Sequence, residues 1–313
     1  MLPRVAIVML NWNSFQDTLE CVESLQTLTY QNFFVVVVDN GSEKDDADKI
    51  ERTFGSFVSL VRNTRNLGYA GGCNVGLRCG FKMGADYIFL INNDMVLARD
   101  CLTKLVEVAQ ADPSIGVVMP TEYSYEERTT KRFPTGIYQL SPLFHLMLQP
   151  LAPMINRVLR LSSEGITELR VMETGMALMR SSIFAEVGLF DPVYFFGGAE
   201  NLELSIAVAR LGLRMYVVPQ ASLWHKGAAS IGGYRKGLRR NTYCGVKNRL
   251  IFVRKNLRGF WKISSLGILL FIHSPLIMLH RLIVIRQPRT AWAVITGIRD
   301  GFATDLANRA VLA

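Results

Sequence analysis

Two glutamates, Glu200 and Glu203, lie three residues apart in the segment 194–204, which reads YFFGGAENLEL. At the start of a helix this spacing places both carboxylates on one face, where the backbone dipole favours negative charge. A carboxylate held there is suited to take a proton from a reacting hydroxyl group. Two solvated charges on a helix surface would have the same spacing. The elements around the pair must therefore decide whether it does chemistry.

Short apolar runs alternate with helical patterns over the first 120 residues. Leu19, Val22 and Leu25 illustrate the three- and four-residue spacing of the helical segments. Continuous apolar strands that alternate with helices predict an α/β fold, in which a mostly parallel sheet is flanked by helices. Ligands bind beyond the carboxyl ends of such strands. Polar residues follow four of the predicted strands, in NWNS (11–14), DNGS (39–42), RNTRN (62–66) and NND (92–94).

Asn, Asp, Gly and Ser also dominate turns, so one polar strand end by itself indicates little. Four together favour a binding site. The glycine-rich segment RNLGYAGGCNVG (65–76) precedes a helical pattern, so its backbone amides could face phosphates. Its glycine spacing does not match a dinucleotide-binding loop, and it contains no Gly-Lys-Ser/Thr of a Walker loop.

The composition limits the class of protein. With 313 residues, of which 50% are hydrophobic, the chain is long enough for one large domain or two fused ones and is not disordered. The five cysteines are scattered without close pairs, which predicts reduced core residues rather than a zinc or redox site. The first apolar run is only as long as a strand, so no secretory signal is expected at the amino terminus.

The net charge of +9 is concentrated in one part of the chain. Residues 205–299 contain 17 Lys and Arg and no Asp or Glu. No nucleic-acid-binding module is recognisable, so we expect no nucleic-acid partner. The apolar segment 263–279 has basic residues on both sides and is shorter than the roughly 20 residues of a spanning helix. It predicts helices lying on an anionic membrane surface. A re-entrant or spanning segment and a buried helical hairpin are the alternatives.

The alternation of strands and helices breaks after residue 120. The chain therefore divides into an α/β half at 1–120, a second half at 121–255 and basic helices at 256–313, which we expect to be membrane-associated. The second half includes an apolar insert, 133–161, punctuated by prolines. This insert is predicted to be a lid, a second membrane-facing element or a segment packed against the C-terminal helices.

Six ordered motifs resemble the inverting family 2 glycosyltransferases with the A-type fold, especially rhamnosyltransferase-like members. They are VVDNGS (37–42), RNLGYAGGCN (65–74), INND (91–94), TGMALMR (174–180), VGLFDPVYFF (187–196) and WHKGAAS (224–230), followed by KNRLIFVRK (247–255). The resemblance is collinear from about residue 5 to residue 255. It is specific for the superfamily and much less so for the sugar.

The resemblance implies a nucleotide-sugar donor, a UDP- or dTDP-sugar, and a divalent cation, Mn²⁺ or Mg²⁺. It makes 1–120 the nucleotide-sugar-binding half and 121–255 the acceptor-binding half. Asp94 matches the last position of an Asp-x-Asp-like metal motif, and His225 matches a later histidine that reaches the same cation. The positions that match nucleotide-binding segments are Asn11, Asn13, Asp39, Asn66, Gly72 and Asn93. The expected acceptor-binding residues are Thr174, Gly175 and Asn201.

In relatives, the general base is the Asp of a Glu-Asp pair, whereas this chain has Glu200-Asn201. Asn cannot accept a proton at neutral pH. Three interpretations follow: Glu200 is the base, Glu203 is the base, or the protein is an inactive scaffold. Glu203 is slightly favoured, because Glu200 would orient the acceptor as the first member of the family's pair does.

The expected function is metal-dependent, inverting, non-processive sugar transfer to a lipid-linked or cell-envelope glycan acceptor. It would take place on the cytoplasmic side of the membrane, with the protein bound peripherally or as a monotopic protein. A processive synthase is disfavoured because no Gln-x-x-Arg-Trp motif is present. A catalytically silent subunit that binds a partner enzyme or lipid is the first alternative. A sugar-nucleotide nucleotidyltransferase is disfavoured, because no basic phosphate loop follows the first strand.

Overall fold

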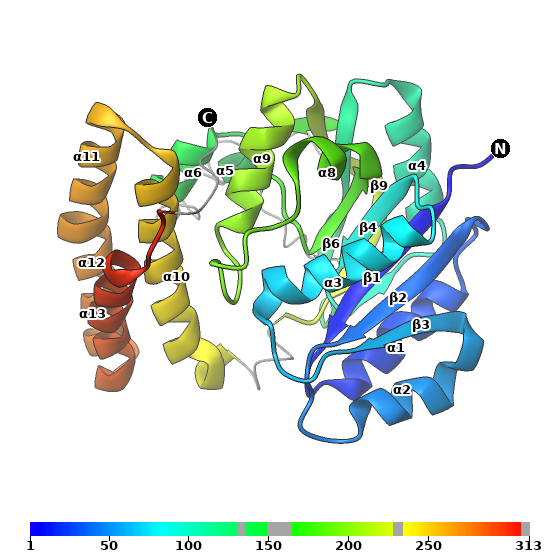
Figure 1. Ribbon diagram of the computed structural model, residues 1–313, viewed down its shortest axis with the longest axis horizontal. Helices are drawn as coiled ribbons and strands as arrows, with labels where there is room; N and C mark the ends of the chain where they lie inside the picture. The colour runs from blue at the N-terminus through cyan, green and yellow to red at the C-terminus, as the bar shows by residue number, and fades with distance from the viewer. Residues whose placement is uncertain (130–134, 149–164, 228–233, 308–313) are drawn as a thin grey trace.

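A nine-stranded sheet forms the centre of the protein (Figure 1). The structure is a computed structural model that describes residues 1–129, 135–148, 165–227 and 234–307. The sheet order is β3-β2-β1-β4-β8-β6-β9-β5, and β7 pairs with β9. The strands are β1 Val5–Asn11, β2 Phe33–Asp39, β3 Val58–Arg62, β4 Tyr87–Ile91, β5 Met95–Leu97, β6 Ile115–Ser124, β7 Thr167–Leu169, β8 Met176–Arg180 and β9 Arg214–His225.

Strands β1 to β4 pair in parallel, and Val5 is in register with Phe33 of β2 and Tyr87 of β4. The predicted α/β fold is confirmed. The sheet is mixed, however, because β8 runs antiparallel to both β4 and β6. The first five residues of β1 are fully buried, as expected for strands with both faces covered. All five cysteines are free, and four of them are buried as predicted for core residues, whereas Cys79 is half-buried.

Helices cover the sheet, and the glycine-rich segment allows one of them to lie close to it. A Cβ on Gly76 would lie 2.3 Å from Val8 Cγ1, so α3 packs directly on β1. The glycines at this position thus serve close helix–sheet packing. The helices of this unit are α1 Phe15–Gln26, α2 Asp46–Phe54, the 3₁₀ turn η1 Gly55–Phe57, α3 Gly68–Lys82, α4 Cys101–Ala111, α8 Ser181–Val187 and α9 Glu200–Arg210.

The C-terminal helices form a separate layer beside the sheet unit (Figure 1). They are α10 Tyr234–Asn256, α11 Gly259–Ile268, the π-helical turn η4 Leu269–His273, α12 Ser274–Ile283 and α13 Pro288–Ala303. A second hydrophobic cluster joins α10 and α13 to α9 through Leu250, Val294 and Leu202. The sequence analysis placed the start of these helices at residue 256. In the structure the layer already includes α10, which begins at Tyr234.

Only part of the apolar insert 133–161 lies within the described residues, as α5 Thr135–Tyr138 and α6 Pro142–Leu148. Leu146 is buried in the second hydrophobic cluster together with α10 residues, so α6 packs against the C-terminal layer. Residues 133–134 and 149–161 of the insert, and the end of the motif 224–230, lie outside the described residues.

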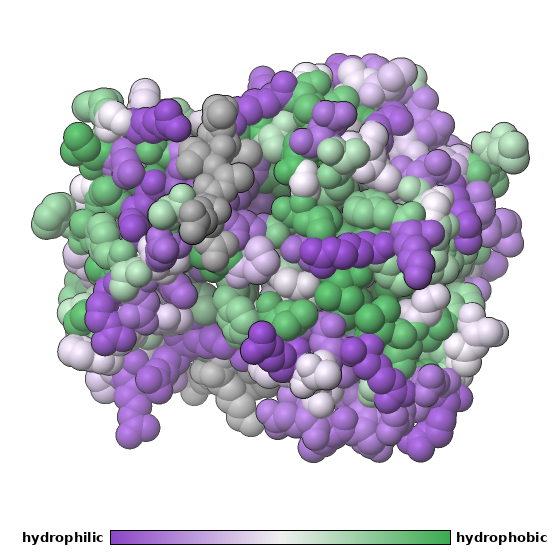
Figure 2. All heavy atoms as spheres, viewed as in Figure 1, coloured by the Kyte–Doolittle hydropathy of each residue, from purple (hydrophilic) through white to green (hydrophobic). Residues whose placement is uncertain are grey.

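The continuous helix from α11 to α12 carries much of the exposed apolar surface. Figure 2 shows hydrophobic residues on the surface over the C-terminal helices. The span Gly259–Ile283 has 25 residues, and its most apolar window has a mean hydropathy of 1.8 and is 17% buried. By length and composition alone this helix could cross a membrane. A buried helical hairpin does not fit this exposure.

Candidate active site

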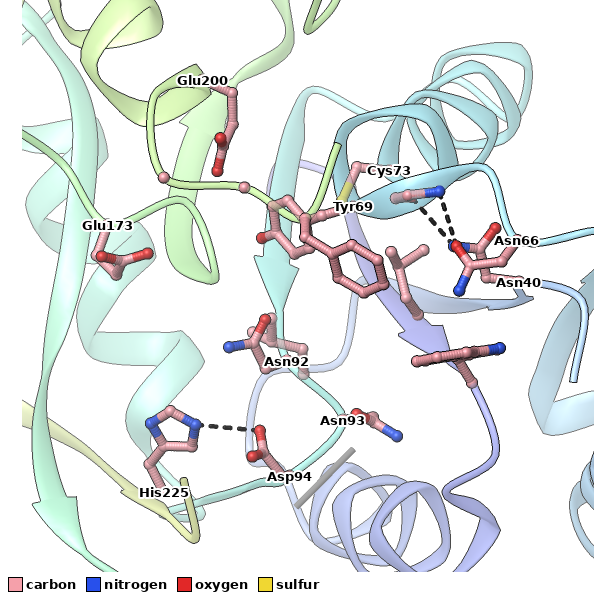
Figure 3. A pocket seen from close by; sticks show the side chains of 17 residues that line it. Asn40, Asn66, Tyr69, Cys73, Asn92, Asn93, Asp94, Glu173, Glu200 and His225 are labelled. Carbon is pink, nitrogen blue, oxygen red and sulfur yellow. Dashed lines mark hydrogen bonds and ion pairs between the residues drawn. The ribbon is translucent and has the colours of Figure 1, made fainter. Parts of the chain in front are cut away.

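One pocket lies at the carboxyl ends of the parallel strands (Figure 3). Its volume is about 350 Å³. All four polar strand ends singled out in the sequence contribute to it, through Trp12, Asn40, Asn66 and 92–94. The parallel register brings these ends to the same edge of the sheet, which explains their convergence.

Two predicted nucleotide-binding residues order the loops beside the pocket without lining it. The amide of Asn11 is fully buried and donates to Asp39 Oδ1 at 2.8 Å and to Asp46 Oδ2 at 3.1 Å. Asn13 has a positive φ of 53°, and its Oδ1 accepts from the backbone N–H of Glu43 at 2.8 Å. Asn11 therefore holds Asp39, and Asn13 joins the loop after β1 to the loop after β2.

A second amide network lies at the pocket wall. Asn40 lies in the predicted strand-end segment 39–42 but was not among the expected nucleotide-binding residues; it donates to Asn66 Oδ1 at 3.2 Å and accepts from Leu67 N–H at 3.1 Å. A Cβ on Gly72 would lie 2.9 Å from Asn40 Nδ2, so Gly72 makes room for this amide. Asn93 lines the pocket and donates to Thr18 Oγ1 at 2.8 Å.

The predicted metal ligands face each other within the pocket (Figure 3). Asp94 Oδ1 lies 3.1 Å from His225 Nε2. Antiparallel pairing places Met95 of β5 in register with His225 of β9, and this brings Asp94 and His225 together. On the other side of the ring, His225 Nδ1 lies 2.7 Å from Glu122 Oε1. Glu122 stands near the end of β6, outside every motif, and the sequence analysis missed it.

Burial alone would lower the pKa of His225, but its hydrogen bonds to Asp94 and Glu122 outweigh burial and raise the pKa to about 10. No cluster of three or more His, Cys, Asp or Glu suited to a metal occurs among the residues that the structure describes. Mg²⁺ is commonly held by one or two carboxylates together with substrate phosphates and water. Asp94 offers one such carboxylate, and His225 would join it as a ligand only when a bound cation displaces the proton from Nε2.

Glu200 begins α9 and points into the pocket (Figure 3). It is 4% exposed, and its Oε2 accepts from the backbone N–H of Ala199 at 3.1 Å. Burial, reinforced by the nearby charge of Glu173, raises the pKa of Glu200 to about 7. Glu173 also lines the pocket and accepts from the hydroxyl of Tyr138 at 3.2 Å. It directly precedes the motif 174–180 and was not recognised as a site residue.

Glu203 lies outside this pocket, because α10 supplies partners for its carboxylate. Its Oε2 is 2.9 Å from Lys255 Nζ, and its Oε1 accepts from Asn256 Nδ2 at 2.6 Å and from the hydroxyl of Tyr194 at 2.5 Å. Three helical residues correspond to about 300° of rotation, so the Glu200 and Glu203 side chains diverge by about 60°. The geometry therefore favours Glu200 over Glu203 as the general base and does not support the slight preference for Glu203.

The expected acceptor residues lie behind the pocket wall. Gly175 packs against Asn92, with a Cβ position 2.8 Å from the Asn92 amide, and Thr174 is 1% exposed. Asn201 donates to the backbone oxygen of Met172 at 3.2 Å. Asn201 also borders a smaller cavity, which shares lining residues with the main pocket.

Comparisons with known proteins agree with this architecture. Residues 6–188 match the family described as Glycosyl transferase family 2. A curated relative, "Inactive polypeptide N-acetylgalactosaminyltransferase-like protein 5" of Macaca fascicularis, is 26% identical over 234 residues, which are 72% of this chain and 52% of that protein. The chain thus spans about half the length of this relative. "Glycosyltransferase GlyG" of Streptococcus pneumoniae is 25% identical over 39% of this chain and 40% of its own.

Two solved structures have a similar fold. The mannosyltransferase PcManGT from Pyrobaculum calidifontis, in complex with GDP-Man and Mn²⁺, has a TM-score of 0.60 at 16% identity and covers 98% of this chain and 77% of its own. S. aureus TarS 1-349, in complex with UDP-GlcNAc, has a TM-score of 0.60 at 13% identity and covers 95% of this chain and 80% of its own. The family match spans more than half of the chain, and the sheet and its strand-end pocket agree with it, so this protein belongs to glycosyltransferase family 2 and has the A-type fold.

Proposed function

We propose that this protein is an active, inverting and non-processive glycosyltransferase. The donor is a UDP- or dTDP-sugar, and the acceptor is a hydroxyl group on a lipid-linked or cell-envelope glycan. The observation that carries the proposal is that the Asp94–His225 pair and the buried Glu200 border one pocket but lie apart within it (Figure 3). A rhamnosyl donor is the first to test, because the sequence motifs resemble those of rhamnosyltransferase-like members.

In this proposal the donor diphosphate lies next to Asp94 and His225. A divalent cation, when bound, neutralises the negative charge that develops on the leaving diphosphate. Glu122 holds the His225 ring through Nδ1, so Nε2 stays directed toward Asp94. Asn66 and Asn93 line the same pocket and offer amide groups to polar atoms of the nucleotide.

Glu200 takes the proton of the acceptor hydroxyl. As its O–H bond breaks, the acceptor oxygen forms a bond to the anomeric carbon, while the bond from that carbon to the diphosphate oxygen breaks. Inversion requires attack from the face opposite the diphosphate, which agrees with the separation of Glu200 from Asp94 and His225 in the pocket. A carboxylate with a pKa of about 7 is well matched to proton transfer near neutral pH.

One observation favours a second candidate, a catalytically silent subunit. Asn201 stands where relatives have the catalytic Asp, and its amide is engaged with the backbone oxygen of Met172. A curated relative is named as inactive. In this case the pocket would bind a ligand without turning it over, and Asn201→Asp would restore turnover.

The two candidates are separated by a donor screen. Purified protein is incubated with individual nucleotide sugars in Mn²⁺, Mg²⁺ or EDTA, and thermal stability and sugar release are measured together. A donor at 100 times its Kd should stabilise the fold by about 2.7 kcal/mol, and only with metal. Stabilisation with transfer or slow hydrolysis supports the enzyme, whereas stabilisation without any turnover supports the silent subunit.

We also propose that the helix Gly259–Ile283 binds the cytoplasmic, anionic surface of the cell membrane, as in a peripheral or monotopic protein. Phe260, Trp261 and Phe271 are among its side chains, and they are 74%, 56% and 80% exposed. Exposed arginines lie just beyond both ends of the helix, at Arg258 and Arg286. Apolar insertion next to basic side chains is the usual composition of interfacial helices.

A further inference from the structure

A small cavity of about 90 Å³ adjoins the main pocket. The two share Glu173, Gly198 and Glu200, so a ligand in one is next to the other. The far side of the small cavity is bordered by Arg249 from α10 and by His145 from α6. The C-terminal helical layer thus contributes a cation to the surroundings of the proposed base.

The Arg249 guanidinium has no counter-ion among the residues that the structure describes. Arg249 is half-buried, and this burial lowers the pKa of its guanidinium to about 10. Glu173 and Glu200 border the same cavity, but neither forms an ion pair with Arg249 among the described residues. Burial, together with the charge of Arg249, lowers the pKa of His145, which favours the neutral imidazole, so this histidine is no counter-ion for Arg249.

Lys255, six residues further along α10, is a buried cation whose charge is balanced by two carboxylates of the protein. Lys255 is 7% exposed and lies 2.8 Å from Asp191 Oδ2 and 2.9 Å from Glu203 Oε2. A guanidinium that is partly removed from water without such partners is costly, because its lost hydration is not offset. Lys255 has carboxylate partners within the protein, whereas Arg249 has none among the described residues. This contrast indicates that a ligand supplies the partner of Arg249.

We propose that the small cavity is an acceptor subsite in which Arg249 binds an oxyanion, a phosphate or carboxylate group of the acceptor. A guanidinium suits this role, because its fork of N–H donors matches both groups in a bidentate manner. Glu200 borders both cavities, so an acceptor anchored at Arg249 presents a neighbouring hydroxyl to the proposed base. This inference rests on the proposed function and narrows its acceptor to an anionic one.

The test uses inorganic phosphate as the probe. The full chain is titrated with phosphate at constant ionic strength, with UDP and Mn²⁺ present at saturation to fill the donor pocket, and thermal stability is followed. We expect phosphate to stabilise the wild type and Arg249→Gln to raise the apparent Kd about tenfold or more, as for loss of a charge-assisted hydrogen bond. Arg239→Gln, at an exposed position of the same helix, is the matched control and should respond as the wild type does.

Arg249→Lys keeps the charge without the fork and should give an intermediate response, which also serves if the Gln variant does not fold. Acetate in place of phosphate shows whether the cavity also accepts a carboxylate. A wild type that responds to neither anion, or an Arg249 variant that folds and responds like the wild type, overturns the proposal. UDP and Mn²⁺ binding is measured separately, so failure of the donor site is distinguished from failure of this subsite.

Discussion

Glu203 Oε2 lies 2.9 Å from Lys255 Nζ, and this ion pair joins α9 to α10 away from the main pocket. Glu200, one turn earlier, lines the pocket instead and forms no ion pair among the described residues. The same helix thus carries one carboxylate for packing and one that is available for chemistry.

We expect Glu200→Gln to lower turnover by about 10² to 10⁴, the usual effect of losing a positioned base, with donor binding retained. Glu203→Gln should leave turnover per folded molecule close to that of the wild type. It should lower the free energy of unfolding by about 1 to 3 kcal/mol, because Lys255 loses one of two partners. Transfer assays and denaturant unfolding measure the two effects. The assignment fails if Glu203→Gln loses turnover while Glu200→Gln keeps it.

The pH dependence follows from the raised pKa of Glu200, about 7. Because the base must be ionised, kcat/KM should fall about tenfold per unit as the pH drops below 7. The contribution of Glu200 to the free energy of unfolding changes with pH in the opposite direction to activity. A carboxyl whose folded pKa is raised above 4.5 stabilises the fold at low pH and loses this contribution as the pH rises through 7, by about 1.4 kcal/mol per unit. Glu200→Gln should therefore be more stable than the wild type at pH 8. An unchanged difference in unfolding free energy between pH 5 and pH 8 would contradict this.

Removal of either proposed metal ligand should weaken Mn²⁺ binding. Asp94→Ala loses the carboxylate oxygen and should abolish metal-dependent donor binding, whereas His225→Ala should have a smaller effect. Electron paramagnetic resonance of Mn²⁺ in the presence of UDP measures both. Asp45→Ala, at a carboxylate that is 51% exposed directly before α2, is the control. If Asp94→Ala retained the metal requirement of the wild type, the cation would be held elsewhere.

Glu122 orients His225 and is expected to act through it. Glu122→Ala should weaken Mn²⁺ affinity by about 10- to 100-fold, the usual cost of losing a partner that positions a ligand. Glu122→Gln keeps an oxygen that accepts from Nδ1 and should recover part of this loss. The same Mn²⁺ titration by electron paramagnetic resonance distinguishes a positioning role from a structural one. Loss of a purely structural residue would change the melting temperature without changing Mn²⁺ affinity.

Membrane binding should depend on exposed basic residues as well as on apolar ones. Substituting Arg258, Arg286 and Arg289 with Gln should weaken binding to anionic liposomes by about 1 kcal/mol per residue. The matched control substitutes Lys44, Arg52 and Lys82, which are exposed on the sheet unit. Liposome flotation at two salt concentrations measures both proteins. Equal binding of the wild type to neutral and anionic liposomes would indicate apolar insertion alone.

The sequence by itself determined the α/β class, the parallel half of the sheet and the edge at which the pocket forms. These features follow from local patterns, since the length and spacing of apolar runs specify strands and helices, and parallel strands present their carboxyl ends together. The reversed direction of β8 depends on the path of the chain between strands, which no local pattern records.

Only the tertiary structure decided which polar residues act together. Glu122 and His225 are far apart in the chain and meet because β6 pairs with β9, with Glu122 in register with Leu223. Glu203 and Glu200 satisfy the same helical pattern, and Lys255 on α10 determines which of them is withdrawn from the pocket. Periodicity specifies the face of an element that a residue occupies, but the neighbour that covers that face comes from a distant segment, and its charge decides between packing and chemistry.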